Sequence, residues 1–329
     1  MGDPAGIGPE VAAKALAHHD LTATCRPLLV GDAAVLQQAL HLIGSDLTLD
    51  IIADVRAVRF QPGACAALGL RNVDLAELEP GRVSADSGRA SYAYVKLATE
   101  LAIQGEVDAI ATGPINKAAW HAAGIPHVGH TELIAALASP DAPASQVTTM
   151  LATHGLRVVH VTRHVPLSEV AALITRKHVL DTIHTTYQGL IQMGIPQPRL
   201  AVAALNPHGG DGGLVGREEL EEIAPAVQAA RQAGIDADGP IPADSIFFRA
   251  IAGEFDVVVA MYHDQGHIPI KTHDFARSVT VTLGLPFLRT SVDHGTAFGM
   301  AWQGKADETS MVEAIRLAAR LARGRGFAP

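Results

Sequence analysis

At positions 256–271 (DVVVAMYHDQGHIPIK), an unbroken apolar run ends abruptly in a cluster of polar residues. A short run of Val and Ala of this kind is typical of a strand buried inside a parallel sheet. In open parallel α/β sheets, ligands bind outside the carboxyl ends of the strands. The sequence therefore predicts a buried strand that delivers His263 and its neighbours to a ligand site.

Similar apolar runs alternate along the chain with segments of helical periodicity. The predicted strands are RPLLVGD, VDAIATG, RVVHVT, RLAVAALN, DVVVAMY and VTVTLG, and the predicted helices cover residues 91–104, 177–193 and 217–233. Strands that alternate with helices in this way predict an α/β fold with a parallel sheet. Residues 61–87 contain scattered Pro and Gly with weak periodicity, which indicates an irregular connection.

Composition excludes several classes of protein. The chain has 329 residues and is 48% hydrophobic, which is enough to bury one large core or two medium ones. No apolar run approaches the roughly 20 residues of a membrane helix, and Met1 leads into Gly-Asp-Pro rather than a signal segment. The net charge of −9 without a basic cluster argues against nucleic acid or an anionic membrane as the partner. We therefore expect a cytoplasmic protein with a small ligand.

Two loops in the first half of the chain have features of anion sites. In GDPAGIGPE (residues 2–10), backbone amides before a predicted helix are able to cradle an anion, although a tight turn explains the glycines equally well. In GHTE (residues 129–132), Thr131 is expected to cap a helix that starts at Glu132, while His130 projects from the preceding loop. The two donor side chains at a helix N-terminus suit a phosphate.

Three histidines follow three different predicted strands: His164 in VTRHVPL, His208 in LNPHGGDGG and His263 in MYHDQG. Three protein ligands with an open position are typical of a catalytic metal site, and imidazole is a common ligand of zinc. The chain has 16 histidines, however, and the long separations of these three are no metal-binding signature, so ordinary surface histidines are an alternative. Asp211 and Asp264 lie beside two of them and either orient the rings or are solvated.

Two cations and a glycine-rich loop complete the candidate residues. Lys117 in ATGPINK is either a cation of the site or a surface lysine, and Arg289 at the end of an apolar run is suited to clamp a carboxylate or phosphate. GMAWQGKA (residues 299–306) lacks the Ser or Thr of a Walker A loop, which excludes a nucleoside triphosphatase. The surrounding loop, with His294 and Asp307, is suited to hold an adenosine.

Seven motifs in one order resemble the 4-hydroxythreonine-4-phosphate dehydrogenase family of vitamin B6 biosynthesis: GDPAGIGPE, TGPINK, GHTE, LNPHGG, GPIPADS, YHDQG and TLGLPFLRTSVDHGTA. The motifs span nearly the whole chain, and the last is similar to the adenosine-binding loop of isocitrate and isopropylmalate dehydrogenases. The resemblance implies the fold of those enzymes, with two α/β/α lobes around a deep cleft, and a homodimer. The first lobe would comprise residues 1–117 and 275–329 with the NAD adenosine loop. The second would comprise residues 118–274 with the metal and substrate ligands and the dimer interface.

The resemblance also implies roles for individual residues. The metal ligands, contributed by both subunits across the dimer interface, would be His164, His208 and His263. Substrate binding would fall to His130, Thr131, Lys271, Thr280 and Arg289, and catalysis to Asp244 and Lys271. The NAD or NADP cofactor would bind at Gly6, Gly8, Asp293, His294, Gly295 and Asp307. The divalent metal would be zinc, magnesium or cobalt.

The implied reaction is the oxidation of 4-phosphooxy-L-threonine by NAD to a 3-oxo acid, which decarboxylates to 3-amino-2-oxopropyl phosphate in pyridoxal phosphate biosynthesis. The metal ion would lower the pKa of the substrate hydroxyl and stabilise the developing enolate, with Asp244 or a metal-bound water as the proton acceptor. Alternatives within the family are the oxidation of D-threonate or D-erythronate 4-phosphate, or of a diol dicarboxylate. Alternatives of other classes are a metal-dependent phosphate-ester hydrolase and a non-catalytic sugar-phosphate-binding protein.

The sequence departs from the family pattern at three places. Thr280 stands where the family has an asparagine, and residues 272–278 (THDFARS) replace a glycine-rich segment, so one substrate contact is expected to differ. His267 in HDQGHIPIK is closer to the catabolic D-threonate and D-erythronate branch. Relatives have a short strand before GDP, so we expect several residues to precede Met1 in the full protein.

Overall fold

The computed structural model describes residues 1–61, 63–139 and 147–327. The chain divides into two compact units, the first formed by Met1–Ala144 and Leu285–Arg323 and the second by Ser145–Gly284 and Gly324–Pro329. The sequence placed the lobe boundaries elsewhere, after residues 117 and 274, so the GHTE segment lies in the first unit rather than in the second. Among the described residues, no helix combines the length and the apolar character needed to cross a membrane.

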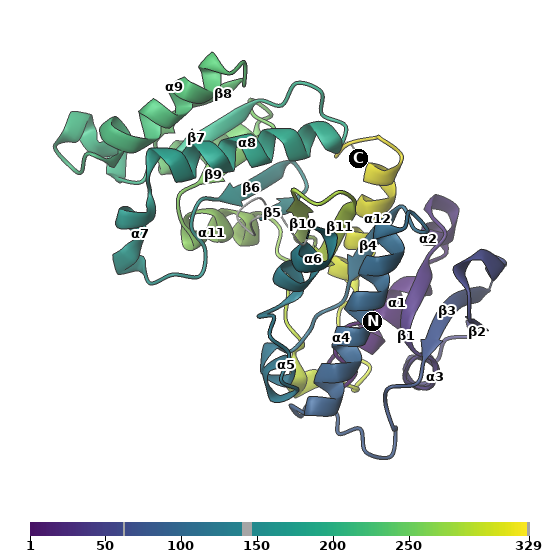
Figure 1. Ribbon diagram of the computed structural model, residues 1–329. Coiled ribbons are helices and arrows are strands. Elements are labelled where there is room, and N and C mark those ends of the chain that lie inside the picture. The colour runs from purple at the N-terminus through teal and green to yellow at the C-terminus, as the bar shows by residue number, and fades with distance from the viewer. Residues whose placement is uncertain (62, 140–146, 328–329) are drawn as a thin grey trace. The chain divides into compact units, whose positions relative to one another are not determined.

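The first unit contains a three-stranded parallel sheet and a separate parallel pair of strands (Figure 1). The sheet has the order β1-β3-β2, with β1 at Leu28–Asp32, β2 at Thr48–Ile52 and β3 at Ala64–Leu70. The pair consists of β4 (Ala109–Thr112) and β11 (Leu288–Val292). The helices are α1 (Gly8–Leu16), α2 (His19–Thr24), α3 (Ala33–Leu42), α4 (Ala85–Ile103), α5 (Lys117–Ala122), α6 (His130–Ala138) and α12 (Thr309–Ala322).

The prediction of an irregular connection over residues 61–87 is wrong for residues 64–70, which form β3, and for residues 85–87, which begin α4, whereas residues 71–84 contain no helix or strand. The sequence of β3 is ACAALGL, and its middle four residues are buried. A strand of small residues that is covered on both faces shows neither alternation nor a large apolar run, so its pattern is weak. Small side chains rather than an irregular backbone therefore account for the weak pattern of residues 64–70.

A buried carboxylate joins three segments of the first unit. Asp32, which is 2% exposed at the end of β1, accepts a hydrogen bond from the Tyr94 hydroxyl of α4 at 2.5 Å. Its other oxygen accepts the backbone N–H groups of Asn72 at 2.7 Å and Val73 at 3.3 Å. A buried carboxylate needs such partners because its charge is desolvated. The contacts fix the strand end, α4 and the connection after β3 to one another.

The second unit contains a six-stranded run in the order β10-β5-β6-β9-β7-β8. The strands are β5 (Thr148–Thr153), β6 (Leu156–His160), β7 (Leu200–Ala203), β8 (Ala237–Ile241), β9 (Val257–Ala260) and β10 (Val279–Leu283). The helices are α7 (Leu167–Leu173), α8 (Arg176–Gln192), α9 (Ala224–Gln232), α10 (Ala243–Ile251) and α11 (His263–His273), and a π-helical turn at Glu219–Ile223 precedes α9. The α/β fold class predicted from the sequence is confirmed.

One strand of this run is reversed. β5 pairs antiparallel with both β6 and β10, whereas β6, β9, β7 and β8 are mutually parallel. The expectation of a wholly parallel sheet is therefore wrong for β5, because β5 and β6 form a hairpin whose turn is His154-Gly155, with Gly155 at a φ of 78°. Glycine at positive φ is the usual signal of a two-residue hairpin turn. The other five strands run in the same direction.

Helices cover both faces of the second unit's sheet. All four residues of β7 and of β9 are buried, as expected for strands with two covered faces. Alternate strand residues, including Ala201, Ala203, Val258 and Ala260, form a core cluster with side chains of α10 and α11. Figure 1 shows α8 along the other side of these strands, next to α9. This arrangement leaves the loops after the strand ends to carry polar residues.

Candidate functional site

The first unit holds the GHTE segment at the start of α6. The helix begins at His130, and Gly129 is its N-cap residue with an extended φ of −175° and no side-chain cap hydrogen bond. The prediction that Thr131 caps a helix starting at Glu132 is therefore wrong, because the helix starts two residues earlier, at His130. His130 and Thr131 are thus the first two residues of the helix, where backbone N–H groups are left for an anion.

His130 is surrounded by positive charge. Its Nε2 is buried and has no hydrogen-bond partner among the described residues. Burial holds the pKa of His130 well below its usual value, and the positive charges of Arg289 and Lys117 lower it further. His130 is therefore neutral at physiological pH and acts as a hydrogen-bonding group. A neutral donor beside these two cations is suited to an anionic ligand.

Arg289 is the buried cation of this group. The sequence predicted that Arg289 follows the end of a strand, but it lies inside β11 and is 3% exposed. One guanidinium nitrogen donates to the Thr112 hydroxyl at 2.7 Å. Burial lowers the pKa of Arg289 to about 10, and the charge of Glu132 opposes this shift. Arg289 therefore stays charged at neutral pH, held at a fixed place by β4.

The second unit holds two of the candidate metal ligands close together. His263 is the first residue of α11, after β9, and His164 follows β6. The centroids of the two rings are 5.7 Å apart. His263 Nδ1 is 2.7 Å from Asp264 Oδ1, which leaves Nε2 directed elsewhere. A carboxylate at one ring nitrogen is the usual partner of a histidine that binds a metal through the other.

The third candidate, His208, lies in the segment Pro207–Gly213 after β7. It is exposed, and its Nδ1 is 3.4 Å from Asp211 Oδ2, so its surroundings repeat those of His263. Within the described part of one chain, no three His, Cys, Asp or Glu side chains are grouped to hold a metal ion. One chain thus brings His164 and His263 together, whereas the structure does not bring His208 to them.

Two further histidines support the ring of His263. His267, one turn along α11, stacks on His263 with centroids 3.6 Å apart and ring planes 10° apart. The ring of His160, buried at the end of β6, is 4.7 Å from that of His267. Gly266 makes this approach possible, because a Cβ there would lie 2.2 Å from His160 Nε2 and 2.7 Å from a methyl carbon of Val158. Nothing in the sequence pattern pointed to a role for His160 or Gly266.

We expect Gly266→Ala to lower the free energy of unfolding by about 2 kcal/mol or more, because an added methyl group overpacks the contact between α11 and β6. Alanine is otherwise the better helix former by about 1 kcal/mol, so a stabilised variant would contradict the assigned packing. Urea denaturation followed by circular dichroism measures the change. Thr272→Ala on the same helix is the control, since Thr272 is exposed and its substitution should change the stability little.

Gln265 explains why the HDQG motif has a glutamine. Its side chain is 8% exposed, its Oε1 accepts the N–H of Met261 at 2.6 Å, and its Nε2 donates to the carbonyl of Ala204 at 2.7 Å. The amide therefore joins the end of β9 to the residue after β7. An amide side chain is required because it both donates and accepts. Gln265 thus sets where α11 begins.

The other predicted residues of the second unit have these positions. Lys271 lies in α11 with its Nζ 4.7 Å from the ring centroid of Phe275. Asp244 is the second residue of α10 and is exposed. Thr280 lies in β10 opposite Leu151 of β5. Their assignment to catalysis and substrate binding stays a prediction.

The predicted nucleotide loop is anchored by α1. Glu10, which is 1% exposed, accepts the N–H of Gly304 at 3.2 Å and of Ala306 at 2.7 Å. Lys14 pairs with Glu10 at 3.0 Å and donates to the carbonyls of the same two loop residues. The carboxylate and ammonium thus satisfy both donors and acceptors of the loop. Nothing in the sequence pattern pointed to Glu10 as the residue that shapes this loop.

The glycines assigned to the cofactor differ in their surroundings. A Cβ on Gly6 would lie 2.9 Å from Thr296 Cβ, and one on Gly8 would lie 2.5 Å from the Met1 carbonyl oxygen. Close backbone packing therefore accounts for both without a ligand. A Cβ on Gly295 would meet no atom within 4 Å, and the neighbouring His294 has its Nδ1 2.9 Å from the Gly295 carbonyl oxygen. Of these glycines, Gly295 is the one with open space around it.

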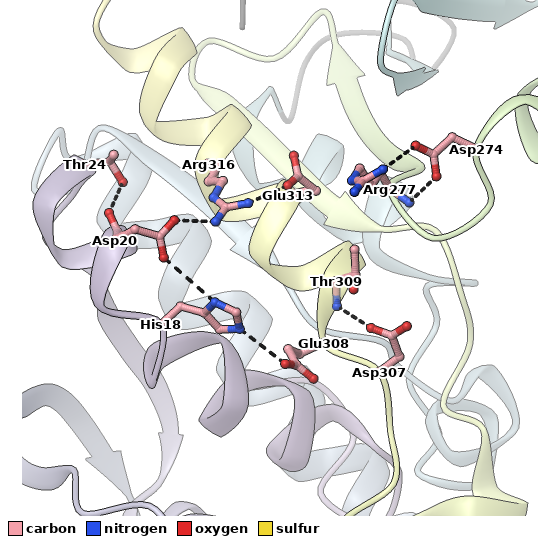
Figure 2. A network of polar contacts seen from close by, with 10 residues as sticks. All are labelled: His18, Asp20, Thr24, Asp274, Arg277, Asp307, Glu308, Thr309, Glu313 and Arg316. Atoms are coloured by element: carbon pink, nitrogen blue, oxygen red, sulfur yellow. Dashed lines mark hydrogen bonds and ion pairs between the residues drawn. The ribbon is translucent and has the colours of Figure 1, made fainter.

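Asp307 and Asp293 both contact the first turn of α12, and Figure 2 shows Asp307 there. Asp307 Oδ1 accepts the N–H of Thr309 at 2.8 Å, and the hydrogen bonds from Thr309 hold the pKa of Asp307 below its usual value. The N–H of Asp293 donates to the Ser310 hydroxyl at 3.3 Å. Figure 2 also shows Arg316 of the same helix between Asp20 and Glu313. Asp307 therefore has a structural role at the helix start, and its cofactor role stays a prediction.

Asp3 in the GDPAG loop is fully buried, and its Oδ2 has no hydrogen-bond partner among the described residues. Burial raises the pKa of Asp3 to about 6, above the value of 3.8 expected for an unfolded chain. The folded state therefore binds the proton more tightly, and this stabilisation is present at low pH and is lost as the pH rises through 6.

We expect the unmodified protein to lose stability relative to Asp3→Asn as the pH rises. Between pH 5 and pH 8, the free energy of unfolding of the unmodified protein should fall by about 1 kcal/mol relative to that of the variant. The reason is that asparagine has no charge to desolvate, whereas the aspartate ionises within this interval. Unfolding by urea at several pH values measures the difference. A constant difference across the interval would show that Asp3 does not titrate there.

Comparison with known proteins relates these positions to a family. A model of the family described as pyridoxal phosphate biosynthetic protein PdxA matches residues 23–318. The chain belongs to the PdxA family. A relative from Symbiobacterium thermophilum named "Putative D-threonate 4-phosphate dehydrogenase" is 49% identical, and the match covers 98% of this chain and 95% of the relative.

Solved structures of the PdxA family agree with the fold. A 4-hydroxythreonine-4-phosphate dehydrogenase from Burkholderia phymatum is 45% identical with a TM-score of 0.86, and one from Klebsiella pneumoniae is 42% identical with a TM-score of 0.90. Each match covers 98% of this chain and 96% of the other. The PdxA family is thus one of dehydrogenases, so the chain is an oxidoreductase. This favours oxidation over the phosphate-ester hydrolase considered above.

Proposed function

We propose that this chain is a dehydrogenase of D-threonate 4-phosphate that depends on a nicotinamide cofactor and a divalent metal ion. The observation that carries the proposal is the 49% identity, over nearly the full length of both chains, to a relative named for this substrate. His267 supports it, because a histidine at this position was the sequence feature that pointed to the D-threonate branch, and it stacks on the candidate ligand His263.

The histidines fit a divalent ion. His164, His263 and His208 follow β6, β9 and β7, which are adjacent parallel strands, so their loops lie at one edge of the sheet. Imidazole nitrogen is a common ligand of zinc and of cobalt. The ring spacing of 5.7 Å between His164 and His263 is compatible with two ligands of one ion. When bound, the ion would lower the pKa of the substrate hydroxyl and stabilise the enolate that follows loss of CO₂.

We further propose that two copies of the chain complete the ligand set, since one chain groups only two of these histidines. The second unit exposes large apolar side chains that are suited to such an interface: Leu167 (72% exposed), Leu214 (88%), Phe248 (76%), Ile268 (61%) and Phe275 (68%). Exposed apolar side chains in this number are typical of a surface that a partner covers. Activity should accordingly require the dimer.

The residues of each unit have separate tasks in the proposed reaction. Arg289, with the neutral His130 and with Thr131, binds the phosphate, because a buried guanidinium at a helix start suits a dianion. The Asp244 carboxylate accepts the proton of the hydroxyl at carbon 3 while the hydride leaves that carbon for the nicotinamide ring. Lys271 binds the substrate carboxylate. The product is a 3-oxo acid, and its loss of CO₂ leaves dihydroxyacetone phosphate.

The test is to follow the reduction of NAD, and in separate reactions of NADP, with each of three substrates: D-threonate 4-phosphate, D-erythronate 4-phosphate and 4-phosphooxy-L-threonine. Parallel reactions contain zinc, cobalt or magnesium, or a chelator, and mass spectrometry identifies the product. We expect the fastest turnover with D-threonate 4-phosphate, and we expect the chelator to abolish it. Equal activity with the chelator would contradict the role of a metal ion, and no NAD or NADP reduction with any substrate would overturn the proposal.

A second candidate substrate is 4-phosphooxy-L-threonine. It is favoured by the names of the two solved structures above, both called 4-hydroxythreonine-4-phosphate dehydrogenases, which match this chain with TM-scores of 0.86 and 0.90. The two candidates differ at carbon 2, where one has a hydroxyl and the other an ammonium group. A preference for the amino substrate in the same assay would assign the chain to pyridoxal phosphate biosynthesis.

A further inference from the structure

The segment that carries His208 has an unusual backbone. Five consecutive residues, from His208 to Gly212, have positive φ angles between 45° and 79°. A residue with a Cβ is less stable in this left-handed region by roughly 1 kcal/mol or more, and two of the five, His208 and Asp211, carry side chains. Contacts from elsewhere in the fold must therefore hold this segment in its conformation.

Glu219 makes such contacts. It is 2% exposed and is the first residue of the π-helical turn before α9. Its Oε1 accepts the backbone N–H groups of Leu205 at 2.8 Å and Asn206 at 2.7 Å, and its Oε2 accepts from Asn206 Nδ2 at 3.0 Å. Three hydrogen bonds to one buried carboxylate hold it and its donors in a fixed arrangement. Glu219 thus fixes the backbone two residues before His208.

The same carboxylate contacts the backbone on the other side of His208. A Cβ on Gly210 would lie 2.7 Å from Glu219 Oε2, so a glycine is needed for the segment to pass this close. The Gly210 carbonyl accepts the N–H of Val215 at 3.0 Å, which closes the segment into a compact loop. A single π turn is often found at functional sites, because the extra residue changes the direction of the side chains around it.

We propose that Glu219 is the positioning residue for His208. Its carboxylate binds the residue two before the histidine and lies against the residue two after it, and thereby sets where the imidazole is presented to the metal ion. This inference rests on the proposed function, in which His208 is a metal ligand. Glu219 does not touch the imidazole itself, so its effect on the metal passes through the backbone of Pro207–Gly213.

The test is Glu219→Gln, measured as metal affinity of the chelator-stripped protein rather than as activity. Glutamine keeps the shape but has no charge, and its NH₂ group opposes the Asn206 Nδ2 donor. We expect the dissociation constants for Co²⁺ and Zn²⁺ to rise roughly tenfold or more, as they do when other residues that orient metal ligands are replaced. Visible absorption measures the binding of Co²⁺, and equilibrium dialysis measures the binding of Zn²⁺. Circular dichroism should show a folded protein at the temperature of the titration.

Glu221→Gln is the matched control, because Glu221 lies in the same turn, is exposed and pairs with Arg217 at 2.5 Å. We expect wild-type affinity from it. Should Glu219→Gln fail to fold, Asn206→Ala removes one of the three contacts with Glu219 and should weaken affinity in the same direction. The inference would be overturned if the folded Glu219→Gln protein had lower thermal stability but unchanged metal affinity. If Glu219→Gln does not fold, the same result from folded Asn206→Ala would overturn it.

His208→Ala separates this inference from the proposed function. If His208→Ala loses affinity while Glu219→Gln keeps it, the positioning role is wrong and the ligand assignment stands. If His208→Ala binds Co²⁺ and Zn²⁺ as the unmodified protein does, His208 is not a ligand, and the metal site of the proposed function is wrong as well. Joint loss in both variants, with Glu221→Gln unchanged, supports the positioning role.

Discussion

His263→Ala should retain the fold and lose the metal ion and nearly all activity. The substitution removes one of two imidazoles whose rings are 5.7 Å apart, and it leaves the ion with two of its three proposed histidine ligands. We expect the metal dissociation constant to rise at least about 100-fold, since residues that only orient ligands already account for 10- to 100-fold. We expect the turnover number to fall by about 1,000-fold or more, because the ion stabilises transition-state charge by several kcal/mol.

Metal content by mass spectrometry and NADH formation measure the two effects. His178→Ala is the control, since this histidine is exposed on α8 in the same unit and bonds only locally, with Nδ1 3.2 Å from the Leu173 carbonyl oxygen. Its metal content and turnover should be unchanged. Full activity of a metal-free His263→Ala protein would refute the assignment of His263.

Arg289→Ala should lower kcat/KM for the phosphorylated substrate by about 100-fold or more. A charged hydrogen-bond pair contributes roughly 1.5–3 kcal/mol, and a guanidinium fork makes two such bonds to a phosphate. The buried Thr112 hydroxyl also loses its donor at 2.7 Å, so the free energy of unfolding should fall by about 1 kcal/mol. Steady-state kinetics at several substrate concentrations measures the first effect, and urea denaturation the second.

Unphosphorylated D-threonate makes the assignment specific. If Arg289 binds the phosphate, the variant and the unmodified protein should differ little with D-threonate, although both should use it poorly. An equal loss with both compounds would place Arg289 elsewhere in the reaction. Arg89→Ala is the control in the same unit, because Arg89 is exposed and pairs only with the neighbouring Asp86 of α4.

Large apolar side chains made the main strands predictable. DVVVAMY and RLAVAALN coincide with β9 and β7, where β-branched and aliphatic residues are buried on both faces. β3 was missed because ACAALGL contains small residues, and the reversal of β5 was missed because a single Gly155 carries the turn signal. Arg289 was placed after a strand because a charge inside a buried strand is uncommon, and only tertiary packing against Thr112 explains it.

The side chains that carry the chemistry of the candidate site were predictable from the sequence. The residues that hold those side chains in place were less so. Histidines and charged residues after strands are visible in the sequence, so His263 and His164 were assigned from position. Glu219 was not, because a glutamate on an amphipathic helix is normally a solvated residue. Its burial and its bonds to a loop 13 and 14 residues away depend on how the π turn packs, which periodicity does not encode. The roles of Glu10 and Gln265 were not predicted either, because their burial and their hydrogen bonds also depend on tertiary packing.

The reversed strand β5 has a practical consequence for engineering. Because β6 starts at the hairpin turn and runs toward the edge that carries the three histidines, the turn at His154-Gly155 lies at the opposite edge of the sheet. Both turn residues are exposed, and a Cβ on Gly155 would meet no atom within 4 Å. A short peptide tag or a fluorophore attached there would report on the protein while leaving the histidine loops untouched.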